Sequence, residues 1–199
     1  MDQRTDEWFA ARIGKVTASR IKDVLAGKTT AARRNYMAQL VVERFTNKAP
    51  ESFTNAAMQW GTDQEPFARA AYEAKLGVLV DETGLVDHPT IPMSGASPDG
   101  LVNDDGLVEI KCPNTATHID TLLSRMPDAD YIGQMQWQMA CTGRKWCDFV
   151  SFDPRMPEHL QLYVIRVMRD DKKIEEIEKE VIKFLSEVDQ KISKLSEII

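Results

Sequence analysis

Hydrophobic residues in the first 76 positions recur every three or four residues, a spacing that gathers them on one face of a helix. Thr5 is a suitable N-cap for the first such segment, and Gly77 stands where the last one would be capped at its C-terminus. A polar stretch that contains Pro50 breaks the pattern and predicts a loop. The predicted helices cover residues 5–12, 17–26, 31–45 and 55–76, and the loop covers residues 47–52.

After Gly77 the pattern changes to short runs rich in β-branched and aromatic residues, which is typical of strands. Two helical stretches separate the third run from the fourth, and the residues from 170 to the end return to a helical spacing. This order predicts an α/β protein of the α+β type, with a mixed central sheet flanked by helices and a long C-terminal helix. The predicted strands cover residues 78–86, 93–96, 107–112, 147–152 and 160–167, and the helices between them cover residues 118–125 and 131–142.

The chain contains no internal repeat and no low-complexity linker, so we expect residues 1–199 to form one domain. Its expected parts are helical residues 1–50, a core of residues 55–167 and a C-terminal helix of residues 170–199. The hydrophobic stripe of that helix either packs on the body of the protein or contacts another subunit or partner. The stripe consists of Ile174, Ile177, Val181, Phe184, Val188, Ile192, Leu195 and Ile199.

Composition limits the class of protein. Of the 199 residues, 43% are hydrophobic and 28% are charged, which suits a globular chain rather than a disordered one. No apolar run approaches the roughly 20 residues that cross a bilayer, and the N-terminus lacks the apolar stretch of a signal peptide. The three cysteines form no CxxC pair, so we expect no disulfide framework, no structural zinc site and a reducing cytoplasm as the location.

Charge is distributed unevenly along the chain. The net charge of −6, taken alone, argues against a nucleic-acid partner. The first 50 residues, however, hold ten of the 25 lysines and arginines and only five of the 31 acidic residues. A polyanion requires such a basic region, although a solvated helix face with incidental cations would give the same count.

Two short segments carry the most informative chemistry. Residues 93–99 and 107–112 are expected to be adjacent strands joined by a turn. Glu109 and Lys111 lie two positions apart in the second strand and would share one of its faces, where Asp99, at the end of the first strand, would meet them.

Two carboxylates and an ammonium at one place suit a hard divalent cation, which prefers oxygen ligands. Such an ion activates water, and two ions roughly 4 Å apart share the work, while Lys111 would orient the water or stabilise charge. A surface hairpin with an acidic turn and an ordinary cross-strand Glu–Lys pair would give the same spacing.

The sequence Pro98-Asp99, followed by Glu109-Ile110-Lys111, is similar to the PD-(D/E)xK nuclease signature. With its flanking motifs, the chain resembles the phage lambda exonuclease (YqaJ-type alkaline exonuclease) family in order and spacing, from about Trp8 to Val167. The flanking motifs are Glu7-Trp8, Arg12-Ile13-Gly14, Thr17-Ala18-Ser19, Trp60-Gly61 with Glu65, Tyr131-Ile132-Gly133-Gln134-Met135-Gln136, and Phe152-Asp153-Pro154-Arg155.

The resemblance implies a restriction-endonuclease-like fold and a 5′→3′ exonuclease that depends on Mg²⁺, with Mn²⁺ as a substitute and two ions bound. Such an enzyme degrades the 5′-phosphorylated strand of linear double-stranded DNA to mononucleotides and leaves a 3′ single strand for phage recombination by strand annealing. The implied partners are double-stranded DNA ends, further copies of the chain in a homotrimeric ring and a single-strand annealing protein, with no membrane. The implied setting is the cytoplasm of a bacterial host, with a phage or prophage gene.

The resemblance also implies the residues of the active site. The matched catalytic residues are Lys111, Glu109, Asp99 and Gln134, and the matched metal ligands are Asp99, Glu109, the backbone carbonyl of Ile110 and Glu65. Judged by its position alone, Glu65 could equally be a solvated helix acid, with Asp63 as a nearby competitor.

A second implied site binds the DNA end. Arg12 and Ser19 match the residues at the 5′-phosphate, and a guanidinium suits that dianion because its fork donates two parallel hydrogen bonds. Thr17 would join Ser19 at the start of the second helix, where free N–H groups favour anions. Met58 and Trp60 are candidates for a wedge or stacking platform at the duplex end, or else for the core. Considered without its neighbours, Arg12 could be an ordinary surface arginine.

The residues leave two other functions open. A structure- or sequence-specific endonuclease would share the metal site but would not need an arginine for a 5′-phosphate. A DNA-binding or recombination-accessory module without catalysis would not need an intact set of Asp99, Glu109 and Lys111. Digestion of linear but not circular duplex distinguishes the exonuclease from both.

Overall fold

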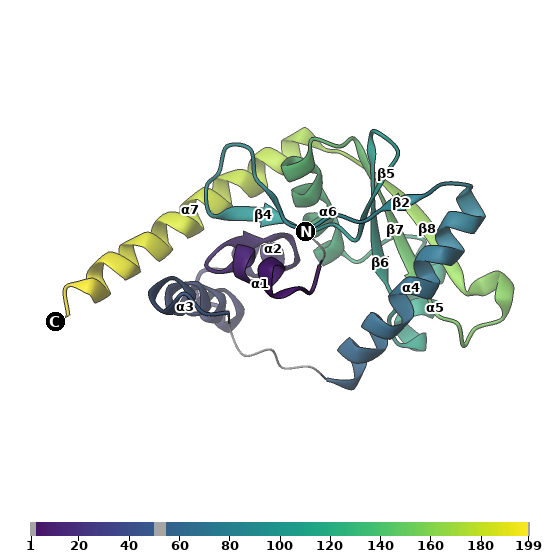
Figure 1. Cartoon of the computed structure of the whole chain (residues 1–199), viewed down its shortest axis with the longest axis horizontal. Helices are drawn as coiled ribbons and strands as arrows, with labels where there is room; N and C mark the ends of the chain where they lie inside the picture. Colours follow the sequence, from purple (N-terminus) through teal and green to yellow (C-terminus); the bar gives the residue numbers. More distant parts are fainter. Residues whose placement is uncertain (1–2, 50–54, 199) are drawn as a thin grey trace.

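Two β-sheets lie at the centre of the computed structural model, which describes residues 3–49 and 55–198 (Figure 1). The strands are β1 (Val16–Thr17), β2 (Val80–Asp81), β3 (Val86–Asp87), β4 (Ser94–Ala96), β5 (Gly100–Val102), β6 (Gly106–Lys111), β7 (Trp146–Phe152) and β8 (Leu162–Met168). The larger sheet has the order β2-β5-β6-β7-β8, and the smaller one has the order β1-β4-β3. Strands β6 and β7 pair in parallel and the other pairs of the larger sheet are antiparallel, so the predicted mixed central sheet is confirmed.

Helices cover both faces of the larger sheet. The α-helices of the structure are α1 (Asp6–Arg12), α2 (Ile21–Leu25), α3 (Ala31–Thr46), α4 (Ala56–Leu76), α5 (Thr115–Ser124), α6 (Ala129–Thr142) and α7 (Asp171–Ser196). Helix α4 lies on one face of the larger sheet and α6 on the other. Helices α1, α3, α4 and α6 match their predicted segments to within two residues, and Thr5 and Gly77 cap α1 and α4 as expected. Helix α5 begins earlier than predicted because the Asn114 side chain caps it. Residues 50–52 of the predicted loop lie outside the described residues.

The predicted helix at 17–26 is wrong in its first half. Val16 and Thr17 form β1, which pairs in parallel with β4, and a short 3₁₀ helix (Ala18–Arg20) follows before α2 begins. Pairing with a distant strand overrides the local helical spacing here, a contact that the sequence pattern does not contain.

The predicted pairing of strands 93–99 and 107–112 is also wrong. Strand β4 pairs with β1 and β3 in the smaller sheet, and the antiparallel neighbour of β6 is β5, which follows Asp99 instead of ending at it. The predicted strand at 78–86 divides into β2 and β3, which lie in different sheets. Strands of two or three residues are too short for a period-2 pattern to reveal them.

Side chains of β6 alternate between two hydrophobic layers. Val108 and Ile110 pack with Ala68 and Tyr72 of α4 on one face. On the opposite face, Leu107 packs with residues of α6. Glu109 therefore points toward α6, while α4 covers the other side of the sheet (Figure 1).

Helix α7 packs on the N-terminal helices through most of its hydrophobic stripe. The first five stripe residues are buried, and Phe184 stacks on Tyr36 of α3 with 5.5 Å between ring centroids. Arg33 of α3 donates to Glu187 across this contact, at 2.7 Å. Packing on the body is therefore confirmed for this part of the stripe. Leu195 is 46% exposed, and Ile199 lies outside the described residues.

None of the helices in the described ranges has the length and apolar character needed to cross a membrane. The three cysteines are free thiols.

A buried ionic network fastens α4 to the sheet. Asp148 of β7 is 1% exposed, and its carboxylate accepts two hydrogen bonds from Arg166 of β8, both at 2.8 Å. The Tyr72 hydroxyl of α4 donates to the same carboxylate at 2.8 Å. Burial of the phenol, followed by its bond to Asp148, raises the pKa of Tyr72, so it stays a neutral donor.

We expect Tyr72→Phe to lower the free energy of unfolding by about 1.5–3 kcal/mol, since it removes a hydrogen bond to a buried charge. Urea denaturation measures this. The matched control is Tyr163→Phe in β8, because the Tyr163 hydroxyl bonds to none of the described residues. Equal losses in both variants would contradict the role of the network.

Candidate active site

Strand β6 carries the centre of the candidate active site. It begins at Gly106, where a Cβ atom would lie 2.1 Å from the Trp146 ring, after a turn in which Asn103 has a left-handed φ of 49°. From there the strand alternates, so Glu109 and Lys111 share a face. The Lys111 ammonium forms an ion pair with the Glu109 carboxylate.

The Glu109 carboxylate is almost completely buried, with 1% of the residue exposed. Helix α6 supplies two amide donors to it: Gln134 Nε2 lies 2.7 Å from Oε1, and Gln138 Nε2 lies 2.6 Å from Oε2. Together with Lys111, these donors compensate the loss of water around a buried charge. Gln134 therefore contacts the site by donating to Glu109. Its amide oxygen could also accept a hydrogen bond from Lys111, but the contact in the structure is the one to Glu109.

Asp99 reaches the same place from the residue before β5. Its Oδ2 accepts a hydrogen bond from the Ile110 N–H at 2.7 Å. In a strand the N–H and C=O of one residue face the same side, so the Ile110 carbonyl faces Asp99 rather than β7. The structure thus brings Asp99, Glu109, Lys111 and the Ile110 carbonyl together, although through β5 and not through the predicted hairpin.

Electrostatic coupling is strong within this group. Burial, followed by the nearby Glu109, raises the pKa of Asp99 to about 8, and Glu65 adds to the rise while Lys111 opposes it. Burial alone would lower the pKa of Lys111, but Glu109 and Asp99 outweigh it and raise that pKa above its ordinary value. Lys111 is therefore a cation among carboxylates. Its ammonium also lies over the Tyr131 ring, with 5.1 Å between Nζ and the ring centre.

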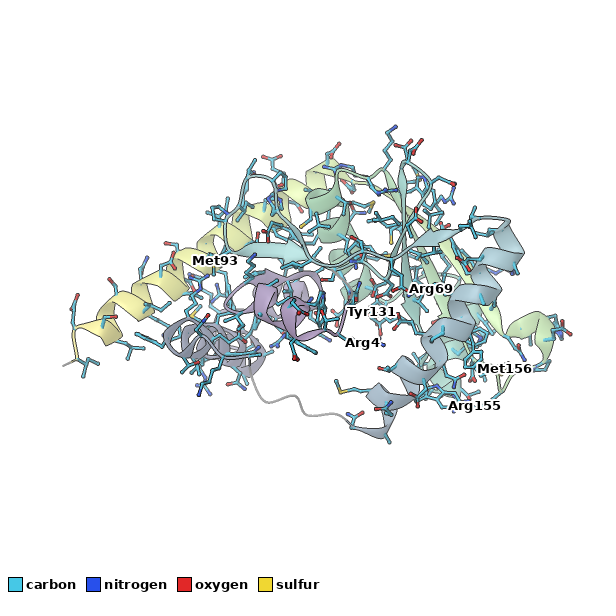
Figure 2. All side chains as sticks on the ribbon, viewed as in Figure 1. Arg4, Arg69, Met93, Tyr131, Arg155 and Met156 are labelled. Carbon is cyan, nitrogen blue, oxygen red and sulfur yellow. The ribbon has the colours of Figure 1, made fainter. Side chains whose placement is uncertain are left out.

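Glu65 projects from α4 toward this group and is held by two arginines. Arg4 Nη2 lies 2.5 Å from Oε2, and Arg69 Nη2 lies 3.3 Å from Oε1. Arg69 also donates to the Asp99 backbone carbonyl at 3.4 Å. These residues line a cavity of about 290 Å³ with Asp99, and Figure 2 shows Arg4 and Arg69 between the N-terminal helices and α4. Glu65 is not the freely solvated helix acid that its position alone allowed.

The chemical type of the available ligand atoms suits a hard cation. Asp99, Glu109, Glu65 and the Ile110 carbonyl offer only oxygen atoms, the ligands that Mg²⁺ takes. The raised pKa of Asp99 also reflects mutual repulsion of carboxylates, which a cation relieves. Among the described residues, however, no three acidic, histidine or cysteine side chains are already grouped as a metal cluster. The carboxylates are instead bound by arginine, lysine and amide groups.

A second cavity, also of about 290 Å³, lies among α1, β1 and α3. Arg12, Thr17 and Ser19 all line it, together with Lys15 and Arg20. The structure therefore brings together the three residues predicted for the 5′-phosphate. We call this cavity the phosphate pocket.

Arg12 is held in a defined orientation at the phosphate pocket. Its guanidinium lies 4.2 Å from the centre of the Trp8 ring and donates to Ser97 Oγ at 3.2 Å. Burial lowers the pKa of Arg12, while Tyr36 and Glu43 oppose that shift. Arg12 is therefore a partly desolvated guanidinium rather than an ordinary surface arginine.

The backbone N–H of Thr17 is not free to bind an anion. Thr17 ends β1 and is the N-cap residue of the short 3₁₀ helix, not of α2, and its N–H donates to the Tyr36 hydroxyl at 3.2 Å. Ser19 is exposed in the 3₁₀ helix. An anion in the pocket would meet the side chains of Arg12 and Ser19, but not the N–H of Thr17.

Met58 and Trp60 lie at the N-terminal end of α4 and differ in environment. Met58 is 55% exposed, so the interpretation as a core residue is wrong for it. Trp60 is partly buried, and the Arg155 guanidinium stacks on its ring at 4.5 Å. Burial would raise the pKa of Asp153, but hydrogen bonds from Arg155 and Thr115 lower it to about 2, so this carboxylate fixes Arg155 over Trp60.

Sequence reasoning assigned no role to four contributors to these sites: Arg4, Arg69, Ser97 and Gln138. Gln138 lies one helical turn after Gln134, so the helical spacing of α6 would have found it. Ser97 lies two residues before Asp99 and accepts hydrogen bonds from both Trp8 and Arg12. No sequence signal connects Arg4 to Glu65, because 61 positions of the chain separate them.

Known proteins resemble this chain in sequence and in fold. The model of the YqaJ-like viral recombinase domain matches residues 7–145. Two crystal structures of LHK-Exo, one of them in complex with dAMP, are each 56% identical to the chain, and each comparison covers 97% of both chains. Their TM-scores are 0.93 for the dAMP complex and 0.92 for the other, an alkaline exonuclease from Laribacter hongkongensis.

A more distant structure shares the fold. The phage-related exonuclease from Haemophilus somnus 129PT has a TM-score of 0.75 at 17% identity, with 91% of this chain and 96% of that chain covered. No curated relative matches the chain in sequence.

The pKa of Asp99 predicts how pH affects the metal-free protein. An acid whose pKa is raised from 3.8 to about 8 on folding contributes stability when protonated, and this contribution is lost as the pH rises from about 4 to about 8. In a chelating buffer, we expect Asp99→Asn to have a higher melting temperature than the wild type at pH 8.5, with a smaller difference at pH 5. Each kcal/mol corresponds to about 2–4 °C for a chain of this size. Asp104→Asn in the exposed turn is the control, and an Asp99→Asn difference independent of pH would contradict the prediction.

Proposed function

The chain belongs to the YqaJ-like viral recombinase domain family, and we propose that it is a Mg²⁺-dependent 5′→3′ exonuclease acting on linear double-stranded DNA. It degrades the 5′-phosphorylated strand to mononucleotides and leaves a 3′ single strand for recombination by annealing. The observation that carries this proposal is the convergence of Asp99, Glu109 and Lys111 beside a pocket that contains Arg12.

Asp99, Glu109, the Ile110 carbonyl and Glu65 would hold the metal, as one ion or two, and Mn²⁺ would replace Mg²⁺. When bound, the metal supplies a Lewis acid and a nucleophilic water. A metal bound by Glu65 would compete with the two arginines that hold this carboxylate, and the ion pair with Arg4 would open to admit it. Released from Glu65, Arg4 would be a cation at the edge of the site, where a phosphate of the scissile strand passes.

The residues of this chain then act on the phosphodiester. Lys111 would stabilise negative charge at the reacting phosphate, since its raised pKa keeps it protonated and unsuited to general-base work. Gln134 would keep Glu109 oriented through the hydrogen bond that its side-chain amide donates. Ser97 would couple the two sites, because Arg12 donates to it and Asp99 lies two residues further along the chain.

Arg12 with Ser19 and Thr17 would bind the 5′-phosphate, and Trp60 with Met58 would contact the end of the duplex. This arrangement explains direction, since only a strand with a 5′-phosphate would be anchored next to the cleavage site. We further propose a homotrimeric ring around the DNA, a single-strand annealing protein as partner, and a phage or prophage product that works in the cytoplasm of a bacterial host.

The first test is digestion of linear and covalently closed circular duplex with Mg²⁺ and with a chelator. We expect loss of the linear substrate only, and only with Mg²⁺. Lys111→Ala should lower the rate by about 10²–10³-fold, the range for loss of one group that stabilises developing charge. Lys145→Ala is the matched control, because Lys145 is exposed and pairs with the turn residue Asp105. Cleavage of closed circles would contradict the exonuclease, and full activity of Lys111→Ala would contradict the site.

The second test concerns the 5′ end. We expect Arg12→Ala to reduce kcat/KM on 5′-phosphorylated duplex by about 10–100-fold, the range for a charged hydrogen bond, with a much smaller effect on duplex with a 5′-hydroxyl. Arg34→Ala, an exposed arginine of α3 outside the phosphate pocket, is the control. Equal effects of Arg12→Ala on the two substrates would contradict its assignment to the phosphate.

A further inference from the structure

Helix α6 carries a buried amide that is directed at Glu109. Gln138 is 0% exposed, and its Nε2 donates to Glu109 Oε2 at 2.6 Å. The residue lies one helical turn after Gln134, so the two amides stand on the same face of α6. Gln138 is thus a second amide at the carboxylate that the proposed mechanism assigns to the metal.

The two oxygens of Glu109 differ in their partners. Oε1 accepts from Gln134 at 2.7 Å and pairs with Lys111, and both of these side chains are only partly buried. Oε2 faces the interior, where Gln138 is its one donor among the described residues. Gln138 therefore fixes the rotation of the carboxylate about its last side-chain bond, because without it one oxygen of a buried charge is unpaired.

Gln138 is kept at a cost to stability. Its Oε1 is buried and has no hydrogen-bond partner within residues 3–49 and 55–198, which is unfavourable in a core. Packing alone would favour methionine or leucine at this position, since neither carries a polar atom that needs a partner. The bond to Glu109 is the interaction that only an amide supplies here.

Gln136 provides a contrast on the same helix. It is also buried, at 2% exposed, but its Nε2 donates to the Met168 carbonyl and its Oε1 accepts from the Asp170 N–H, at 2.8 and 2.9 Å. Gln136 thus joins α6 to the segment before α7, and both ends of its amide are used there. Gln136 is therefore a structural amide, whereas Gln138 is directed at the active site.

We propose that Gln138 is a positioning residue that holds Glu109 in the orientation needed for divalent-metal binding and for its pairing with Lys111. The proposal rests on the proposed function, because it assigns Glu109 to the metal. Gln138 acts through Glu109 and does not touch substrate, so its effect is to orient a metal ligand. Loss of such a group lowers metal affinity by about 10–100-fold.

The test compares Gln138→Met with Gln136→Met in the full chain, using Mn²⁺ as the probe in isothermal titration calorimetry and thermal unfolding as a measure of folding. We expect Gln138→Met to weaken Mn²⁺ binding by about 10–100-fold, and Gln136→Met to bind Mn²⁺ as the wild type does, even where it lowers the melting temperature. On linear duplex at saturating Mg²⁺, Gln138→Met should lower kcat while the KM for DNA stays unchanged.

A second variant, Gln138→Asn, keeps the amide but shortens its reach, and serves if the methionine variant fails to fold. We expect weaker Mn²⁺ binding for it as well. Wild-type affinity in either folded variant of Gln138, or an equal loss in Gln136→Met, would overturn the positioning role. A wild-type chain that binds no Mn²⁺ and degrades no linear duplex would overturn the proposed function and this inference with it, whereas an active wild type with an unaffected Gln138→Met would overturn the inference alone.

Discussion

The structure is organised around one buried charge, the carboxylate of Glu109. A carboxylate with almost no exposure is stable in the interior only if donors replace its lost water, and three donors do so here. Lys111 comes from the same strand, and the two amides come from α6, which must lie over that face of β6 at the correct height. The packing of α6 on the sheet therefore buries hydrophobic side chains and also supplies the amide donors that the buried carboxylate of Glu109 needs.

The same segment that leads into β5 connects the two candidate sites. Ser97 accepts from Trp8 and Arg12, and Asp99 accepts from the Ile110 N–H, so three residues of chain fix the distance between the phosphate pocket and the acidic group. Under the proposed function, this short link would set the separation between the group that binds the 5′ end and the group that acts on the phosphodiester.

Much of the fold and the outline of the site could be predicted from the sequence, because both depend on local spacing. Helical periodicity and caps located α3 and α4, and a separation of two in a strand placed Glu109 and Lys111 on one face. Contacts between distant segments could not be predicted in this way. Strand β4 pairs with β1 in the smaller sheet instead of forming the expected hairpin, and Arg4 forms an ion pair with Glu65. Periodicity describes which face a residue occupies, but not which segment covers that face.

A count of cations in the N-terminal region does not reveal which of them have partners, because those partners also come from distant segments. Several of the cations counted there have partners: Arg33 is buried against Glu187, and Arg44 pairs with Asp189, so both hold α7 instead of facing outward. The positive charge at the phosphate pocket therefore comes from a few oriented groups, led by Arg12, and not from the sum over the region. Since exposed charges are screened within about 10 Å at moderate salt, a partly buried guanidinium such as that of Arg12 would contribute more to selecting a terminal phosphate than additional cations spread over the surface.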